Sequence, residues 1–382
     1  MNSSFFDYAG FCFEEALRPG QLAEQVEQLK FELRNYIELT RETIAQTLGI
    51  SSPQILLTGG STQAFKQLLL NASIFPEQGT VVCSDLIYPK MYNMLAARCQ
   101  KLTVVPISTL ENGMEMVRLL ASKVNNCTKV MMVDVVDNRR GIAIPLDALA
   151  EQVRSRNPNC RIVLDASQAY RQLPQLKISS DYYDFLFADL KKWCGFKTFT
   201  GVGFLAVSSM AQLEHVARTA DSQFAVHPSL LAYSVGYADA GGADFWSWCL
   251  AHQYVNEAFE DFETQNQTKA QEFIRCMKAT REDIRLWPSE ESIWNTGIVS
   301  IVGKTQYLQT LYETLKEKGI FCSLIPTNLA PFPKALRKDE ACLRFSFHDL
   351  KTSSEDVRRL VDLLQSLMIP EQKEHYSHIG AG

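Results

Sequence analysis

Short, continuously apolar segments alternate with longer segments of helical spacing between residues 55 and 207. Apolar runs of this kind are typical of strands that are covered on both faces. Because the strands alternate with helices, the pattern predicts a mostly parallel sheet with helices packed on both sides. The predicted strands are residues 54–60, 80–84, 101–107, 129–136, 161–167, 184–188 and 203–207, and the predicted helices are residues 61–72, 90–97, 115–124 and a segment after Pro145.

The pattern changes after Gly242, where residues 244–278 form one long helical pattern that we interpret as a connector. The segments that follow predict a smaller α+β domain, with strands at 295–303, 319–325 and 342–347 and helices at 306–318 and 353–368. The chain has 382 residues, which leaves room for two domains at about 150 residues each. We expect a large domain over residues 21–265, a small domain formed by residues 1–20 and 266–370, and a tail over residues 371–382.

Composition narrows the class of protein. Hydrophobic residues make up 46% and charged residues 21% of the chain, which is ordinary for a globular protein. The formal net charge is −5 and no basic patch stands out, so we expect no nucleic-acid partner. The ten cysteines are scattered, without a CxxC pair or a cluster at zinc spacing. This indicates free thiols in a reducing compartment and no metal site.

The N-terminal segment contains Asp7, Glu14 and Glu15, which come too early for a signal peptide. No apolar run approaches the roughly 18 residues that a membrane span needs. We therefore expect a cytoplasmic protein with no membrane partner.

Polar residues that follow the strands are candidate site residues, because ligands of open α/β sheets bind beyond the carboxyl ends of the strands. The sequence TGGST, residues 58–62, joins the first strand to a helix, and the free N–H groups of a helix start favour phosphate. We call this turn and helix start the phosphate seat; Ser61 and Thr62 are its hydroxyl residues. Any tight strand-to-helix turn has a similar pattern. Tyr88 precedes Pro89 after the second strand, where the alternative is a capped helix with a packed tyrosine.

Two later strands also end in polar residues. Asn138 follows the strand at residues 129–136 and is either a turn residue or a ligand contact. Asp165 closes the next apolar strand, and Gln168 lies three residues further on. A carboxylate at the end of such a strand is costly to bury without a cationic partner. The alternative for Asp165 is a helix N-cap.

Lys191 and Lys192 follow the strand at residues 184–188, where the alternative is a solvated lysine pair. Together, the strand ends hold a phosphate seat, an aromatic residue, an Asn, an Asp, a Gln and a lysine. This set matches pyridoxal phosphate (PLP): a lysine forms the Schiff base, an aspartate holds the pyridine nitrogen protonated, and an aromatic ring stacks on the cofactor.

Three segments resemble the class V aminotransferase family: VLDASQAYRQLP (163–174), YDFLFADLKKW (183–193) and GVGFLAV (201–207). Their order is the family's strand–Asp–x–x–Gln, strand–Lys and closing strand. The family consists of fold type I PLP enzymes and includes cysteine desulfurases, cystine C–S lyases, isopenicillin-N-epimerase-like proteins and kynureninase. FFDYAG (5–10) resembles its N-terminal segment, and CLRFSFHDLKTSSEDVRRLVDLL (342–364) resembles its C-terminal arginine strand and final helix.

The resemblance spans nearly the whole chain and implies the fold type I architecture. That architecture has a mostly parallel, seven-stranded sheet in a large PLP-binding domain and a smaller α+β domain. The resemblance also implies pyridoxal 5'-phosphate as cofactor and a small amino-acid substrate. A homodimer is implied as well, because the family builds its site at the subunit interface.

Roles at the candidate site follow from the resemblance. Lys192 lies eight residues after Asp184, as in the family, and would be the Schiff-base lysine. Arg344 would bind the substrate α-carboxylate, which suits its planar guanidinium. The implied cofactor contacts are Asp165 with the pyridine nitrogen, Gln168 and Asn138 with the phenolic oxygen, Tyr88 stacked on the ring, Ser61 and Thr62 at the phosphate, and Lys191 beside the phosphate.

Two departures from the family pattern bear on the reaction. Asp189 stands near the phosphate position, where relatives have a small or hydroxyl residue. Desulfurases also need a nucleophilic cysteine on the loop ahead of the carboxylate arginine, and residues 323–341 contain none. Cys322 and Cys342 flank that segment inside predicted strands.

The sequence therefore predicts a PLP-dependent aminotransferase or lyase that removes the Cα proton of an amino acid condensed with the cofactor. Transamination, β-elimination of the kind a C–S lyase performs, and epimerisation all remain open. A catalytically silent scaffold with the same fold is the alternative from another class. The intact set of Lys192, Asp165 and Arg344 argues against it.

Overall fold

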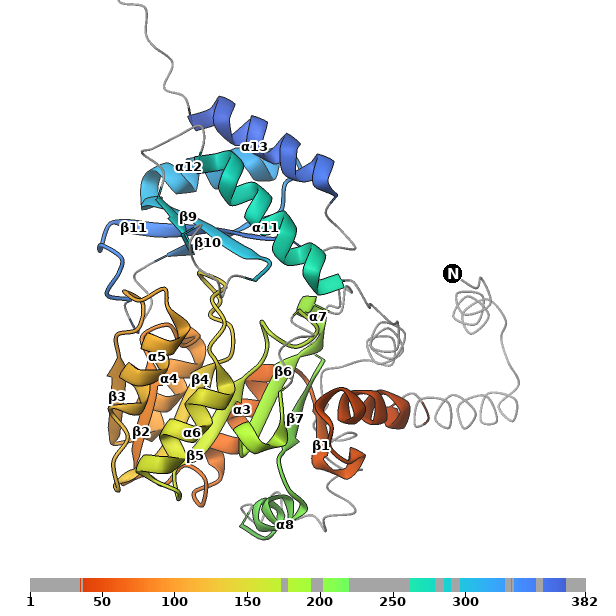
Figure 1. Cartoon of the computed structure of the whole chain (residues 1–382), viewed down its shortest axis with the longest axis vertical. Coiled ribbons are helices and arrows are strands. Elements are labelled where there is room, and N and C mark those ends of the chain that lie inside the picture. Colours follow the sequence, from red (N-terminus) through yellow and green to blue (C-terminus); the bar gives the residue numbers. More distant parts are fainter. Residues whose placement is uncertain are drawn as a thin grey trace, which may run out of the picture.

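The computed structural model describes residues 37–172, 178–193, 202–219, 262–278, 285–289, 296–326, 333–347 and 353–368, together with residues 35 and 331. These residues form two sheets, each with its own helices (Figure 1). Among them, no helix is both long and apolar enough to cross a bilayer.

The larger sheet has seven strands in the order β1-β7-β6-β5-β4-β2-β3. Neighbours from β3 through to β6 pair in parallel, whereas β7 runs antiparallel to both β1 and β6. The mostly parallel sheet is therefore confirmed. The strands are β1 (Ile55–Thr58), β2 (Thr80–Ser84), β3 (Lys101–Val105), β4 (Thr128–Asp134), β5 (Arg161–Asp165), β6 (Phe185–Asp189) and β7 (Gly203–Val207).

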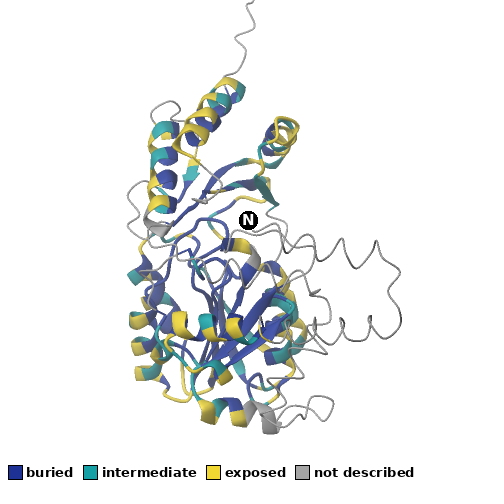
Figure 2. Ribbon diagram, turned by 90° about the vertical axis from the view of Figure 1, so that its right-hand side faces the viewer, coloured by how far each residue is buried: buried dark blue, intermediate teal, exposed yellow. Residues whose placement is uncertain are grey.

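Helices cover both faces of this sheet, as the alternating pattern predicts. On one face, Phe65 of α3 and Leu95 of α4 pack into a cluster with Val163 of β5. On the other face, helical residues 37–48 pack with α5 and α6 around Leu164. Figure 2 shows the strands as the buried centre and exposed residues on the outer helices. The helices are α3 (Ser61–Leu70), α4 (Pro89–Arg98), α5 (Gly113–Ala121), α6 (Leu146–Arg156), α7 (Leu190–Trp193) and α8 (Met210–Thr219).

The smaller sheet is antiparallel and has the strand order β10-β11-β9-β8. Its strands are β8 (Arg285–Trp287), β9 (Ile298–Lys304), β10 (Ser323–Pro326) and β11 (Glu340–Ser346). One face packs against α11 (Phe262–Lys278), α12 (Thr305–Glu317) and α13 (Ser354–Met368). This is the α+β part that the sequence predicts.

The other face of the small sheet packs against the large one. Ile298 and Val302 of β9 belong to the same buried cluster as Ile142, which follows β4. Gly141 permits the close approach: its φ is 70°, and a Cβ there would lie 2.6 Å from the Cβ of Ile298. The small sheet therefore lies against the carboxyl end of β4.

The elements differ from the prediction in several places: helical residues 37–48, α7 and α8 were not predicted, and the strands predicted at 54–60, 101–107 and 161–167 end earlier, at Thr58, Val105 and Asp165. The sequence pattern did not predict β8, which has three residues and is too short to show a period. Strand β10 begins at Ser323 instead of residue 319, because Gly319 adopts φ 76° and ends α12 in the left-handed conformation that glycine favours. Residues 244–261 of the predicted connector lie outside the described residues, and α11 forms the remainder.

Candidate active site

Ser61 and Thr62 are the first two residues of α3, directly after β1 and a two-glycine turn. Gly60 in that turn has φ 112°, a conformation that residues with a side chain rarely adopt. No side chain caps this helix start. The N–H groups of Gln63 and Ala64 donate to the carbonyl of Gly60, which leaves those of Ser61 and Thr62 for an anion. Ser61 is buried and Thr62 is half-buried. The structure thus places the predicted phosphate seat at a helix start beside the sheet.

Gly203, the first residue of β7, fixes the seat against the neighbouring strand. A Cβ on Gly203 would lie 2.4 Å from the carbonyl oxygen of Ala188 in β6 and 2.8 Å from the Cα of Gly60. Only a residue without a side chain lets these segments approach so closely. The turn before α3 is therefore held near the carboxyl end of β6.

Asp165 is the last residue of β5 and is buried, with 6% of its surface exposed. Its Oδ1 accepts a 2.8 Å hydrogen bond from the backbone N–H of Ser167. Burial raises the pKa of the carboxyl, and the nearby charge of Lys192 lowers that pKa. Residues 167–172 form turns, so Asp165 stabilises a turn and is not the helix cap considered above.

Lys192 lies in α7, three residues after β6 ends at Asp189. Its side chain is exposed, and its charge acts on the pKa of Asp165 on the adjacent strand end. Lys191 precedes it in the same helix, and the Lys191 side chain lies outside the described residues. Asp189 is buried at the end of β6. The predicted lysine and aspartate therefore meet at the same edge of the sheet.

Arg344 of β11 reaches from the small sheet to this edge. Its Nη1 donates a 2.9 Å hydrogen bond to the carbonyl of Asn138, and its Nη2 donates a 3.3 Å bond to Oγ of Ser323. Among the described residues, the buried Nε of Arg344 and the buried Oδ1 of Asn138 have no hydrogen-bond partner. The structure thus brings together two residues that the sequence predicts for substrate and cofactor, each with a polar atom still available.

Tyr88 occupies the N-cap position of α4 and is 42% exposed, so it is not the packed tyrosine of the alternative interpretation. Burial lowers the pKa of Arg344, and Tyr88 acts in the opposite direction. Tyr88 therefore lies near enough to Arg344 to act on its pKa, and much of its side chain is exposed.

Gln168 is buried, and its Oε1 accepts a 3.0 Å hydrogen bond from the indole N–H of Trp193. Trp193 follows Lys192 directly, so this bond ties the turn after β5 to the lysine helix. The carboxamide N–H groups of Gln168 can still donate to a ligand oxygen.

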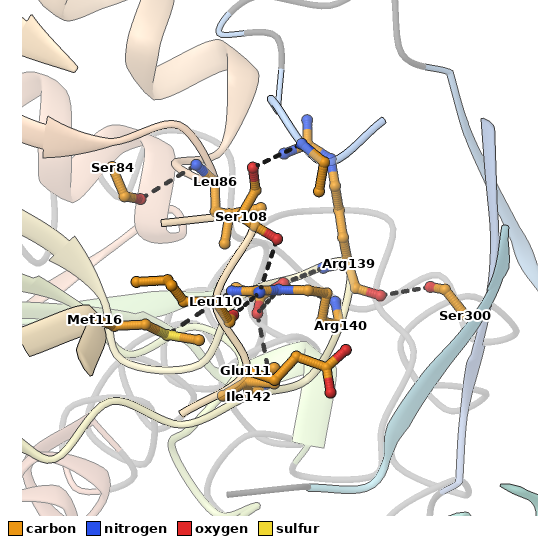
Figure 3. A network of polar contacts seen from close by, with 12 residues as sticks. Ser84, Leu86, Ser108, Leu110, Glu111, Met116, Arg139, Arg140, Ile142 and Ser300 are labelled. Atoms are coloured by element: carbon orange, nitrogen blue, oxygen red, sulfur yellow. Dashed lines mark hydrogen bonds and ion pairs between the residues drawn. The ribbon is translucent and has the colours of Figure 1, made fainter. Parts of the chain in front are cut away.

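The turn after β4, residues 137–141, connects the large sheet to the small one through polar contacts (Figure 3). The carboxylate of Asp137 accepts bonds from the backbone N–H groups of Arg139 and Arg140 at 3.0 and 2.6 Å, and from Nε of Arg140 at 3.0 Å. The guanidinium of Arg140 also lies over the ring of Trp287, 5.2 Å from its centroid. Ser300 of β9 donates to the carbonyl of Arg139. Asn138 is therefore held in a rigid turn.

Sequence reasoning missed three charged residues of this region: Asp134, Arg139 and Arg140. All three are buried, with 5%, 1% and 0% of their surfaces exposed. Asp134 lies inside the strand predicted at residues 129–136, followed by Val135 and Val136, so the sequence did not mark it as a strand end; the structure ends β4 at Asp134. The arginines had no signal either, since their burial depends on the small sheet.

These residues fit PLP. The buried carboxylate of Asp165 suits a protonated pyridine nitrogen, and the start of α3 suits a phosphate. Buried polar groups without a partner, as found on Asn138 and Arg344, are uncommon in folded proteins and are expected where a polar ligand binds. The seat, the aspartate, the lysine and the arginine all lie at strand ends next to the small sheet.

Known proteins share the fold that carries these residues. The cystine C–S lyase C-DES, solved with its product cysteine persulfide, superposes with a TM-score of 0.69 at 17% identity, covering 88% of this chain and 87% of that one. A cysteine desulfurase from Thermococcus onnurineus NA1 superposes with a TM-score of 0.70 at 15% identity, covering 93% and 86%. At such identities the likeness concerns the fold.

A C-DES variant with glycine covalently linked to its PLP cofactor has a TM-score of 0.72 at 16% identity, with 94% of this chain and 90% of that one covered. In sequence, PbSufS of Plasmodium berghei (strain Anka), provisionally named a cysteine desulfurase, is 24% identical over 181 residues. That match covers 44% of this chain and only 33% of the relative's length. The family model described as aminotransferase class-V matches residues 18–360, and the chain therefore belongs to the class-V aminotransferase family.

Proposed function

We propose that this protein is a PLP-dependent enzyme that removes the Cα proton of a small α-amino acid. The observation that carries the proposal is the meeting of Lys192 and Asp165 at neighbouring strand ends, where the charge of the lysine acts on the buried carboxyl. When bound, the cofactor supplies the electron sink for the electrons left on Cα.

Four parts of the site have separate tasks in this proposal. Arg344 binds the substrate carboxylate through its guanidinium, since bidentate pairing fixes the substrate's orientation. Asp165 keeps a proton on the pyridine nitrogen, and the start of α3 holds the phosphate. Lys192 holds the cofactor covalently at rest and takes the Cα proton as a free amine during turnover.

The proposal includes two points that follow from family membership and domain architecture. We propose that the large unit spans residues 21–265 and the small unit residues 1–20 and 266–370. We also propose a homodimer, because the family builds its site at the subunit interface. Analytical ultracentrifugation of the pure protein at several concentrations measures the mass directly.

An amino-acid panel tests the function. Pure holoenzyme is incubated with each candidate substrate in deuterated water, and Cα exchange is followed together with keto acid, sulfide and pyruvate. We expect Cα exchange with at least one amino acid, and the accompanying product identifies the reaction. A holoenzyme that exchanges the Cα proton of no amino acid contradicts the proposal and supports the silent scaffold.

A second candidate is direct β-elimination at a C–S bond, which needs no enzyme thiol. Burial raises the pKa of Cys322 to about 11. Burial also raises the pKa of Cys342 to about 12, with Arg139 opposing it. Thiols with such pKa values contain almost no thiolate at neutral pH and are poor nucleophiles. Since residues 323–341 contain no cysteine, these two thiols are the ones nearest to that loop in sequence. Release of pyruvate, ammonia and cysteine persulfide from cystine would identify this reaction.

A further inference from the structure

Two carboxyl groups lie side by side at the pyridine end of the site. Asp134 ends β4, Asp165 ends β5, and the two residues are register partners in this parallel pair of strands. Neighbouring strands lie about 4.8 Å apart, and register partners point to the same face. That face carries Met132 and Val163 in its core. Asp134 therefore shares the buried face from which Asp165 meets the cofactor.

The surroundings of the two carboxyls are unequal. Oδ1 of Asp165 accepts the N–H of Ser167, whereas the buried Oδ1 of Asp134 has no hydrogen-bond partner among the described residues. Asp134 is 5% exposed. An isolated buried carboxylate without a partner is far more costly than the neutral acid.

Charged groups on the neighbouring elements shift the pKa values of Asp134 and Asp165. Burial raises the pKa of Asp134 well above its usual range; Asp165 and Asp137 raise it further, and Lys192 and Arg139 lower it. Burial raises the pKa of the Cys83 thiol in β2, and Asp134 and Asp85, which follows β2, raise it further. Burial also raises the pKa of Asp165; Lys192 and the hydrogen bonds from Ser167 lower it, and Asp189 at the end of β6 raises it. When two like charges share a buried site, one of them keeps its proton.

We propose that Asp134 and Asp165 hold one proton between them, with Asp134 as the neutral member and Asp165 as the ionised one. Asp134 is then a positioning residue that acts through Asp165. A neutral acid beside Asp165 adds no second negative charge, and it can donate a hydrogen bond that favours the ionised form of Asp165. The role of Asp134 toward the pyridine nitrogen rests on the proposed function. The proton shared by Asp134 and Asp165 is independent of the proposed function.

The pH dependence of apoenzyme stability tests the shared proton. An unfolded aspartate ionises near pH 3.9, whereas Asp134 stays protonated in the folded state until the pH reaches its raised pKa. The stability that this group contributes is therefore complete below about pH 4 and is lost as the pH rises toward the folded-state pKa. In Asp134→Asn the side chain at position 134 does not titrate. The folded-to-unfolded ratio of this variant should gain about tenfold per pH unit over the wild type between about pH 5 and the folded-state pKa of Asp134, and no more above it.

A stability difference between Asp134→Asn and the wild type that changes with pH in the opposite direction contradicts the proposal. If Asp134 were ionised and paired with Arg139, its pKa would be depressed, and the wild type would keep or increase its advantage over Asp134→Asn as the pH rises. Met132→Leu is the matched control, since it changes the same buried face of β4 without a titrating group. Its stability difference from the wild type should not change with pH.

A measurement on the wild-type chain covers the case in which Asp134→Asn does not fold. In the infrared spectrum of apoenzyme at neutral pH, we expect the carbonyl stretch of a protonated carboxyl, and it should shift when aspartate is labelled with ¹³C at the carboxyl. A spectrum with no such band at neutral pH would overturn the proposal. Both measurements use apoenzyme, so a protein that fails to bind PLP would contradict the proposed function alone.

The role toward the cofactor has its own measurement. The ¹⁵N chemical shift of labelled cofactor reports whether the pyridine nitrogen carries a proton. We expect a protonated nitrogen in the wild type and in Asp134→Asn, whose amide can still donate, and a shift toward the unprotonated value in Asp134→Leu. Identical shifts in all three proteins would show that Asp134 does not act on the cofactor.

Discussion

The guanidinium of Arg344 donates a 2.9 Å hydrogen bond to the backbone carbonyl of Asn138, across a sequence separation of 206 residues. This bond joins β11 of the small sheet to the turn after β4. Because that turn is itself fixed by the carboxylate of Asp137, the arginine has a defined position over the strand ends. One contact thus sets the positions of Arg344, proposed to bind the substrate, and of Asn138, expected to contact the cofactor.

Arg344→Lys should weaken substrate binding without weakening cofactor binding. A lysine cannot keep the bond to Asn138 and also pair in bidentate fashion with a carboxylate. A hydrogen bond to a charged group contributes about 1.5–3 kcal/mol, so KM should rise about ten- to a hundredfold. Steady-state kinetics and the cofactor absorption band measure the two effects. Arg285→Lys, at the exposed pair with Glu340, is the control and should leave KM unchanged; an Arg344→Lys enzyme with wild-type KM would refute the assignment.

Borohydride reduction should fix the cofactor on Lys192. Its position in α7 after β6, beside Asp165, is the reason. Peptide mapping after reduction should place the label on Lys192 in the wild type and also in Lys191→Ala. Lys192→Ala should bind the cofactor only reversibly and lose the label. A label on Lys191 would show that the assignment of the two lysines is wrong.

Asp165→Asn should bind cofactor, remain folded and be nearly inactive in Cα-proton exchange. The substitution keeps the size of the side chain but removes the charge opposite the pyridine nitrogen. Removal of one partner of a buried pair costs roughly 3–5 kcal/mol, and the ring avoids this cost by losing its proton. A loss of about 4 kcal/mol lowers the exchange rate on the order of a thousandfold. Exchange within about tenfold of the wild type would contradict the role of Asp165.

Gly203→Ala should destabilise the fold and weaken cofactor binding together. The new Cβ would lie 2.4 Å from the carbonyl oxygen of Ala188 and 2.8 Å from Gly60, so the seat must move. Overpacking of this kind costs about 1–3 kcal/mol. Gly303→Ala in β9 is the control, because its nearest new contact is Leu308 at 3.8 Å. Urea unfolding and cofactor titration test both variants, and equal behaviour of the two would refute the packing argument.

Turnover with cysteine or cystine should leave no persulfide on the enzyme. Cys342 is buried and Cys322 is half-buried, and burial raises the pKa of each thiol. Thiol labelling followed by mass spectrometry during turnover measures this. A persulfide on Cys322 or Cys342 that is required for turnover would assign the protein to the persulfide-forming desulfurases. Sulfide released without an enzyme persulfide agrees with direct elimination.

The sequence by itself was sufficient to predict the features that depend on residues close together along the chain. Apolar runs and helical periods located the strands of the large sheet and the helices α3 to α6, because those periods reflect which faces are buried. Asp165 and Lys192 could be found in the same way, since each follows an apolar strand, and strand ends of a parallel sheet meet at one edge. Asp134 could not be found in this way, because two further apolar residues, Val135 and Val136, follow it in the sequence.

Only the tertiary structure decided which of these groups touch. The bond from Arg344 to Asn138, the stacking of Arg140 on Trp287 and the register of Asp134 with Asp165 depend on strand order and on the packing of the small sheet. A local pattern sets whether a segment is a strand but not which strand lies beside it. Burial of an arginine or a carboxyl is set by segments far away in the chain, and that burial determines which groups keep their protons.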